Sequence, residues 1–94
     1  MEFLVERYVP GLSELDVEAA ADRARLVCEQ MTAEGTEVRY LGSTFLPEEE
    51  ACFCRFEAHS AAAVAEANRR AAIPFARIVA ARHVRPTLSE RSRR

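Results

Sequence analysis

Two runs of β-forming residues near the middle of the chain constrain its fold more than any other feature. Residues 36–46 (TEVRYLGSTFL) and 51–58 (ACFCRFEA) are rich in aromatic and β-branched side chains, and only the short stretch PEEE separates them. This pattern predicts an antiparallel hairpin with a charged tip at residues 47–50. Any fold for the chain must therefore place these two strands side by side.

Patterns typical of helices lie on both sides of the hairpin. Before it, Ser13 can cap a helix whose first turn is acidic, and Gly35 can end that helix. After it, Ser60 opens an alanine-rich helix that reaches about Ala72, before the sequence IPF breaks it. The apolar residues of the first helix recur every three or four positions, and they are Val17, Ala20, Ala24, Val27 or Cys28, and Met31.

Residues 2–9 and 76–84 alternate as strands do, which completes the order βαββαβ. Two βαβ halves with right-handed crossovers predict a ferredoxin-like α+β fold, a four-stranded antiparallel sheet with both helices on one face. We expect one domain over residues 1–85 and a disordered basic tail over residues 86–94.

The size and charge of the chain narrow the classes of partner. A core built from 94 residues is thin, so self-association is expected to supplement it. A formal net charge of -2 points to neither nucleic acid nor a membrane surface as partner. The first residues, MEFLVERYVPG, contain Glu2 and Glu6 and no continuous apolar run, so we expect no signal peptide or membrane span and a cytoplasmic protein.

Three cysteines are an odd number, and we expect free thiols at Cys28, Cys52 and Cys54. Residues two apart on a strand are separated by about 6.6 Å. That spacing is too wide for a disulfide and poor for two thiolates on one tetrahedral ion. Cys52 and Cys54 are therefore predicted to fill the core.

The length of the hairpin loop fixes which residues share a face of the sheet. Leu46 is expected opposite Ala51. Counting back from this pair, the side under the helices carries Phe45 with Cys52, Ser43 with Cys54 and Leu41 with Phe56. The other side, which we call the bare face, carries Thr44 with Phe53, Gly42 with Arg55 and Tyr40 with Glu57. The first strand is expected to add Phe3, Val5 and Val9 to the core, and Leu4, Glu6 and Tyr8 to the bare face.

The bare face is too apolar to leave in water and too charged to bury without partners. We expect a second copy to cover it, which gives a homodimer of the dimeric α+β barrel type with a cleft between the two sheets. Arg55 could be neutralised there by Glu6 or Glu57. The residues predicted to line the cleft and bind a ligand are Glu6, Tyr8, Tyr40, Arg55 and Glu57.

Common catalytic motifs are missing from the sequence. It contains no nucleophile elbow, HExxH, phosphate-binding glycine loop or CxxC pair, which removes most support for a hydrolase, a nucleotide-binding protein or a zinc ribbon. His59 and His83 are expected at the rim of the fold. Neither is predicted to be a catalytic base.

The stretch YLGSTFLPEEEACFCRFEAHSAAAVAEANRRAAIPFARIV resembles a family of small proteins, formerly a domain of unknown function, that is typified by a nickel-responsive, nickel-binding protein. The most specific matches are the hairpin with FC before EA, and Arg69 and Arg70 followed by Ile73 and Pro74. The resemblance extends from FLVERYVPG to about residue 84. It implies a ferredoxin-like homodimer that binds nickel.

Members of that family that look metal-competent carry histidines at positions matching Gly42 and Asn68, and some have another at Glu6. Glycine offers no ligand, and an asparagine amide is a hard donor that suits nickel poorly. Of the matched positions, Glu6 and Cys54 are the candidate metal ligands. The predicted register places these two side chains on opposite faces.

The sequence therefore predicts a non-catalytic homodimeric protein that binds a small ligand or a transition-metal ion in the inter-sheet cleft. An alternative is a cofactor-free enzyme of the oxygenase, isomerase or cyclase type, with Glu6 as the base and Arg55 as the oxyanion partner. A third possibility is an interaction module that recruits a partner through the basic tail.

Overall fold

The computed structural model of the chain describes residues 1–86. The elements follow in the predicted order, and they are β1 (Glu2–Tyr8), α1 (Glu14–Ala33), β2 (Val38–Leu46), β3 (Ala51–Ala58), α2 (Ala61–Arg70) and β4 (Arg77–Ala81). All of the predicted tail except Pro86 lies outside the described residues.

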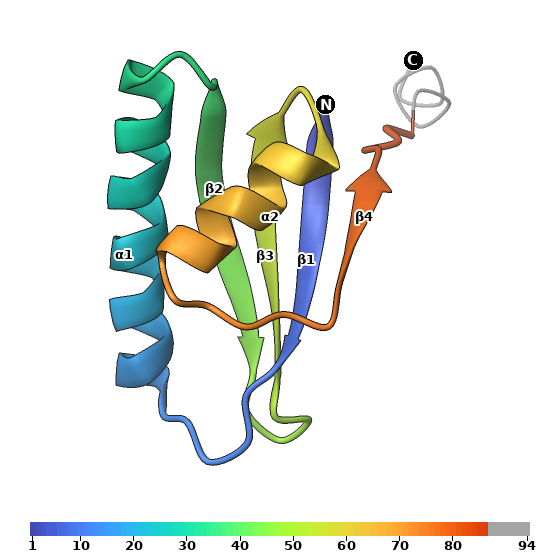
Figure 1. Cartoon of the computed structure of the whole chain (residues 1–94). Helices are drawn as coiled ribbons and strands as arrows, with labels where there is room; N and C mark the ends of the chain where they lie inside the picture. Colours follow the sequence, from blue (N-terminus) through green and yellow to red (C-terminus); the bar gives the residue numbers. More distant parts are fainter. Residues whose placement is uncertain (87–94) are drawn as a thin grey trace.

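The four strands form one antiparallel sheet in the order β2-β3-β1-β4. Both helices lie on the same side of this sheet, and α1 runs alongside the edge strand β2 (Figure 1). This arrangement confirms the predicted ferredoxin-like fold. Neither described helix combines the length and apolarity needed to cross a bilayer.

Local side-chain chemistry sets the ends of α1. The Ser13 hydroxyl accepts from the Asp16 backbone N–H at 3.3 Å, while the Asp16 carboxylate accepts from the Ser13 backbone N–H at 2.9 Å. These hydrogen bonds from Ser13 lower the pKa of Asp16. Gly35 follows the last turn with a φ of +108°, a conformation that favours glycine. Both predicted helix signals are thus confirmed.

β4 is shorter than its sequence pattern suggests. It was expected to span residues 76–84 but ends at Ala81. Ala81 pairs with Glu2, which is the first residue of β1, so residues 82–86 have no neighbouring strand to bond with. The length of the partner strand, and not local propensity, ends β4.

The hairpin register agrees with the prediction from Leu46–Ala51 as far as Gly42–Arg55, and then it shifts. Tyr40 lies opposite Phe56, and Arg39 opposite Glu57. The predicted pairs Leu41–Phe56 and Tyr40–Glu57 are therefore wrong. The cause is a bulge between Tyr40 and Gly42, made possible by the φ of +145° at Gly42, which turns the Tyr40 ring under α1.

The core lies between the sheet and the helices. Cys28, Cys52 and Cys54 are buried and free, as predicted. Two polar side chains, Arg7 and Asn68, are also buried, and the sequence pattern did not single them out. The apolar core otherwise follows the expected faces, with Phe3, Val5, Val9, Val17, Ala20, Ala24, Met31, Val38, Phe56, Ala58, Val64, Ala67, Ala71 and Ile73.

Candidate functional site

The bare face carries four of the five side chains predicted to bind a ligand. Glu6 and Tyr8 alternate outward on β1, and Arg55 and Glu57 do so on the neighbouring strand β3. Tyr40 is the exception, because the bulge moves it to the helix side of the sheet, where it packs against the core. Its predicted place in the inter-sheet cleft is therefore wrong.

Ion pairs neutralise the charges on this face. The Glu6 carboxylate lies 2.9 Å from Nε of Arg77, and Glu2 lies 2.8 Å from His83 and 4.0 Å from Arg55. Arg55 thus pairs with Glu2, whereas the sequence had suggested Glu6 or Glu57 as its partner. The reason is that Glu6 is held by Arg77, while Glu57 accepts from the N-terminal amine of Met1 at 3.0 Å.

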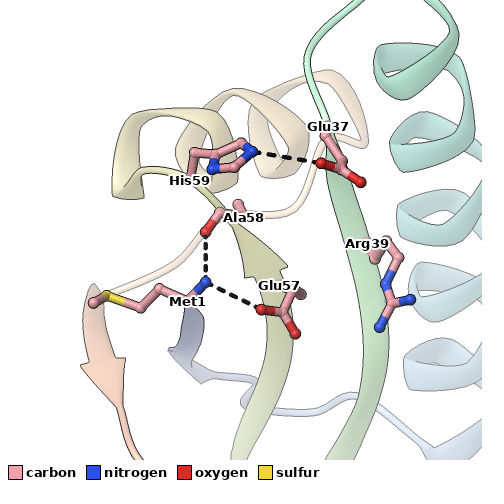
Figure 2. Close-up of a pocket in the computed structure, with 6 residues that line it drawn as sticks. All are labelled: Met1, Glu37, Arg39, Glu57, Ala58 and His59. Carbon is pink, nitrogen blue, oxygen red and sulfur yellow. Dashed lines mark hydrogen bonds and ion pairs between the residues drawn. The ribbon is translucent and has the colours of Figure 1, made fainter.

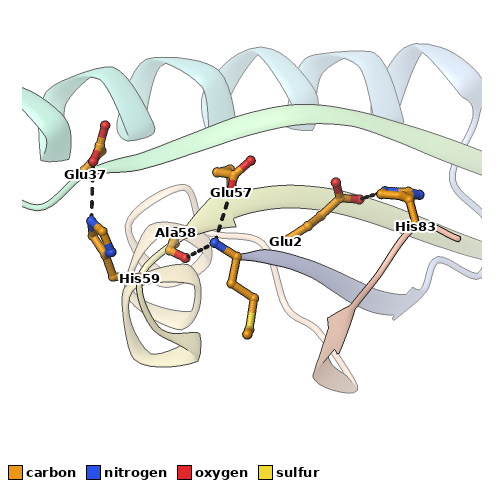
Figure 3. A network of polar contacts seen from close by, with 7 residues as sticks. Glu2, Glu37, Glu57, Ala58, His59 and His83 are labelled. Atoms are coloured by element: carbon orange, nitrogen blue, oxygen red, sulfur yellow. Dashed lines mark hydrogen bonds and ion pairs between the residues drawn. The ribbon is translucent and has the colours of Figure 1, made fainter.

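Figure 3 shows how these contacts follow one another across the ends of the strands. The Met1 amine bridges Glu57 and the carbonyl of Ala58, and its hydrogen bond lowers the pKa of the Glu57 carboxyl. Further along, His83 contacts Glu2. This end of the bare face is thus a polar strip in which acids are bound by basic groups.

A pocket of about 310 Å³ opens at the same end of the sheet (Figure 2). His59 lies 3.4 Å from Glu37 across it, and both side chains are exposed. His59 and His83 are surface residues, as predicted. The pocket lining consists of Met1, Glu37, Arg39, Glu57, Ala58 and His59, so Glu57 alone belongs to the predicted binding set.

The metal ligands suggested by the family resemblance do not converge within one chain. Cys54 points into the core opposite Val5, whereas Glu6, the next residue along β1, points to the bare face. Asn68 is buried and its amide donates to the carbonyl of Val64, while Gly42 has no side chain. Over residues 1–86, no cluster of three or more His, Cys, Asp or Glu side chains could hold a metal ion. These residues do not fit a nickel site.

A second candidate site lies on the helix side of the sheet, around Arg7. Its side chain is only 4% exposed, and it lies directly opposite Cys52 on the neighbouring strand. Within the described part of the chain Arg7 has no carboxylate partner, and its Nε has no hydrogen-bond acceptor. A buried guanidinium without a counter-ion is costly, so the groups beside it must supply compensating charge.

The neighbours of Arg7 are two thiols connected to a short chain of hydroxyls. The Sγ atoms of Cys52 and Cys54 are 3.9 Å apart, and the Ser43 hydroxyl donates to Cys54 at 3.0 Å. The Tyr40 hydroxyl shares a hydrogen bond of 2.5 Å with Ser43. A continuous polar path therefore leads from Cys52 through Cys54 and Ser43 to Tyr40.

This arrangement separates the acidities of the two thiols. Hydrogen bonds from Cys52 and Ser43, together with the charge of Arg7, lower the pKa of Cys54 despite its burial. The pKa of Cys52 is raised, because this thiol is hydrogen-bonded to Cys54 and is buried. Burial also raises the pKa of the Tyr40 phenol. Cys54 is thus the group in this cluster that favours the anion.

The polar path ends in a groove between α1 and β2. One part of the groove, about 390 Å³, is lined by Ser43 and Tyr40 with Glu14 and Glu18 at its mouth. A second part, about 620 Å³, has Cys28 among its lining residues. Tyr40 lines both parts, so it marks their junction. We call the two parts together the α1–β2 groove.

Sequence reasoning missed this site for two reasons. The alternation of β1 places Arg7 on the same side as Val5 and Val9, a signal that the sequence carries but that was interpreted only for the apolar residues. The position of Tyr40 depends on the bulge before Gly42, and an isolated glycine in a strand pattern is a weak indication of one.

Comparisons with known proteins agree with the fold. The sequence profile of the family described as "Nickel responsive protein SCO4226-like" matches residues 3–80. The crystal structure of SCO4226 from Streptomyces coelicolor A3(2) superposes with a TM-score of 0.74 at 16% identity, covering 90% of this chain and 100% of that one. No curated protein matches the sequence.

Proposed function

The chain belongs to the SCO4226-like family of nickel responsive proteins, and on that premise we propose that it is a non-catalytic binding protein that works as a homodimer in the cytoplasm. The two copies would meet through their bare faces. A small ligand would then lie in the cleft between the sheets, beside Glu6, Tyr8, Arg55 and Glu57.

The observation that carries this proposal is the mixed character of the bare face. Leu4 and Val79 are paired neighbours on it, and Phe53 extends the same apolar surface on β3. Val79 remains 38% exposed and Tyr8 is more exposed still. A contiguous surface of this kind favours a partner. An antiparallel sheet packed on its own copy would bury it around a two-fold axis.

Nickel is the ligand that the family description suggests, but the described residues do not fit a nickel site in one chain. The ligand that suits the bare face is instead a small polar molecule. It could exchange partners with the ion pairs Glu6–Arg77 and Glu2–Arg55, which already hold both signs of charge in place.

The alternative of a cofactor-free enzyme gains no support from these contacts. Glu6, its expected base, is bound by Arg77, and Arg55, its expected oxyanion partner, lies beside Glu2. Both would have to leave their ion pairs before acting on a substrate. The binding role requires no such step.

Light scattering on the untagged full chain tests the dimer, using Val79→Asp and the matched control Leu26→Asp. Both side chains are exposed aliphatic groups, but Leu26 is on α1, away from the bare face. We expect dimers for the wild type and for Leu26→Asp, and monomers for Val79→Asp. A wild-type monomer at micromolar concentration would contradict the proposal.

Native mass spectrometry of the same preparation tests the ligand. A bound small molecule that is lost in Val79→Asp and retained in Leu26→Asp is expected. Stoichiometric nickel bound to the wild type would instead support a metal-binding function. It would show that side chains other than Glu6 and Cys54 complete a metal site.

A further inference from the structure

We propose that Cys54 is a reactive thiolate that small hydroperoxides oxidise to sulfenic acid after entering the α1–β2 groove. This site lies on the opposite side of the sheet from the proposed dimer surface. It is therefore independent of the proposed function.

The first support is the charge of Arg7. Its guanidinium is buried next to the two thiols and has no acidic partner among the described residues. A cation in such a place is stabilised if a neighbour becomes an anion. Cys54 is the neighbour whose surroundings favour ionisation, because its sulfur accepts a hydrogen bond from Ser43 and shares one with Cys52.

The second support is the access route. Cys54 is itself only 4% exposed, but the Ser43 hydroxyl that contacts it at 3.0 Å belongs to an exposed residue that lines the groove. The groove therefore comes within one side chain of the sulfur. Because Cys54 is buried, a small hydroperoxide can approach the sulfur far more readily than a protein or a large disulfide can.

The negative charge at the mouth of the groove further limits which reagents can enter. Glu14 and Glu18 line this part and are exposed. They repel anions, so a neutral peroxide enters more readily than an anionic one. Size and charge thus select for the same small neutral electrophile.

Cys28 provides a comparison within the same molecule. It is as buried as Cys54 and lines the larger part of the groove, but its electrostatic surroundings are the reverse. Burial and the neighbouring Glu29 raise the pKa of its thiol to about 11. Cys28 lines the groove directly, whereas Cys54 lies behind Ser43, so access alone would favour oxidation of Cys28. Cys28 is therefore the internal control for the reactivity of Cys54.

The reaction conserves atoms and electrons. The thiolate sulfur of Cys54 attacks one oxygen of the peroxide, an S–O bond forms and the O–O bond breaks. Sulfur loses two electrons, and the leaving oxygen takes them as hydroxide or alkoxide. The oxygen bound to sulfur carries a proton in the product, and protonation of the leaving group yields water or an alcohol beside the sulfenic acid.

The test is peptide-resolved mass spectrometry of the reduced full-chain protein after treatment with hydrogen peroxide and dimedone at neutral pH. A chelator is present, so that metal-catalysed oxidation does not contribute. We expect the dimedone adduct to form on Cys54 at least about tenfold faster than on Cys28. Folding of every variant is checked by circular dichroism.

Two variants test the cause. Arg7→Met fills similar space without charge, and we expect it to slow labelling of Cys54 at least about tenfold while Cys28 is unaffected. Ser43→Ala, at an exposed position, removes the hydrogen bond without disturbing the core, and we expect a smaller decrease. The proposal would be overturned if Cys54 and Cys28 were labelled equally, or if Cys54 were labelled only after unfolding by urea. It would also be overturned if Arg7→Met folded and reacted like the wild type. Should Arg7→Met fail to fold, an unchanged Cys54 rate in Ser43→Ala would do the same.

Discussion

Tyr40 lies directly opposite Phe56, with ring centroids 5.4 Å apart and planes inclined by 59°, on the helix side of the sheet. The contact connects the centre of the core to the α1–β2 groove, which Tyr40 lines. It exists because the bulge before Gly42 turns Tyr40 inward.

Tyr40→Phe keeps the ring contact and removes only the hydroxyl that bonds to Ser43. We expect the free energy of unfolding to fall by about 1 kcal/mol. Tyr40→Ala also removes the ring and is expected to cost about 3 kcal/mol or more. Urea denaturation of both variants measures the difference, and equal losses would show that the ring does not contribute to the core.

Gly42→His restores a histidine at one of the family positions but places a side chain on a backbone with φ of +145°. A Cβ there would lie 3.3 Å from Nη2 of Arg55. We expect a loss of about 1–3 kcal/mol in unfolding free energy from backbone strain. Thr44→His, on the same face of β2 and without positive φ, is the control and should lose far less in the same denaturation experiment.

The pKa of Cys54 is lowered on folding, so the folded protein binds fewer protons at this site than the unfolded chain. The resulting stabilisation is fully present above the unfolded thiol pKa and is lost as the pH falls through the lower folded value. Between the folded pKa of about 6 and the ordinary value of 9.0, we expect wild-type stability to rise relative to Cys54→Ser by on the order of 4 kcal/mol. Urea titrations over this range measure it, and parallel curves for the two proteins would contradict the shift.

Ser13→Ala removes the side-chain half of the capping box at the start of α1. We expect a loss of about 1 kcal/mol in unfolding free energy. The pKa of the Asp16 carboxyl should also rise toward its ordinary value, because the bonds from Ser13 are what lower it. NMR titration of Asp16 checks this, with Ser60→Ala as a control that alters the cap of α2 and leaves Asp16 unchanged.

The fold could be predicted because its determinants are local. Ser13, Gly35 and Ser60 mark helix ends by their own chemistry, and the four-residue loop at 47–50 fixes the hairpin register near the turn. Neighbouring strands then constrain one another through alternation. These signals are enough to give the order of elements and the helix-covered face.

The candidate sites were less predictable because they depend on tertiary geometry. Arg55 pairs with Glu2 because Glu6 is already paired with Arg77. Arg77 comes from β4, which is far from Arg55 along the chain. Arg7 shows the opposite case, since simple alternation places it inside. A charged residue on a buried position of a strand is therefore a useful signal for a polar site within a core.

The bulge in β2 has one further consequence, for how copies of this protein can assemble. β2 is an outer strand, and the extra residue at Leu41 interrupts the regular spacing of its backbone groups. An extended segment from another molecule could not pair with the backbone N–H and C=O groups of β2 in one register on both sides of the bulge. Growth of the sheet into a fibril is therefore disfavoured.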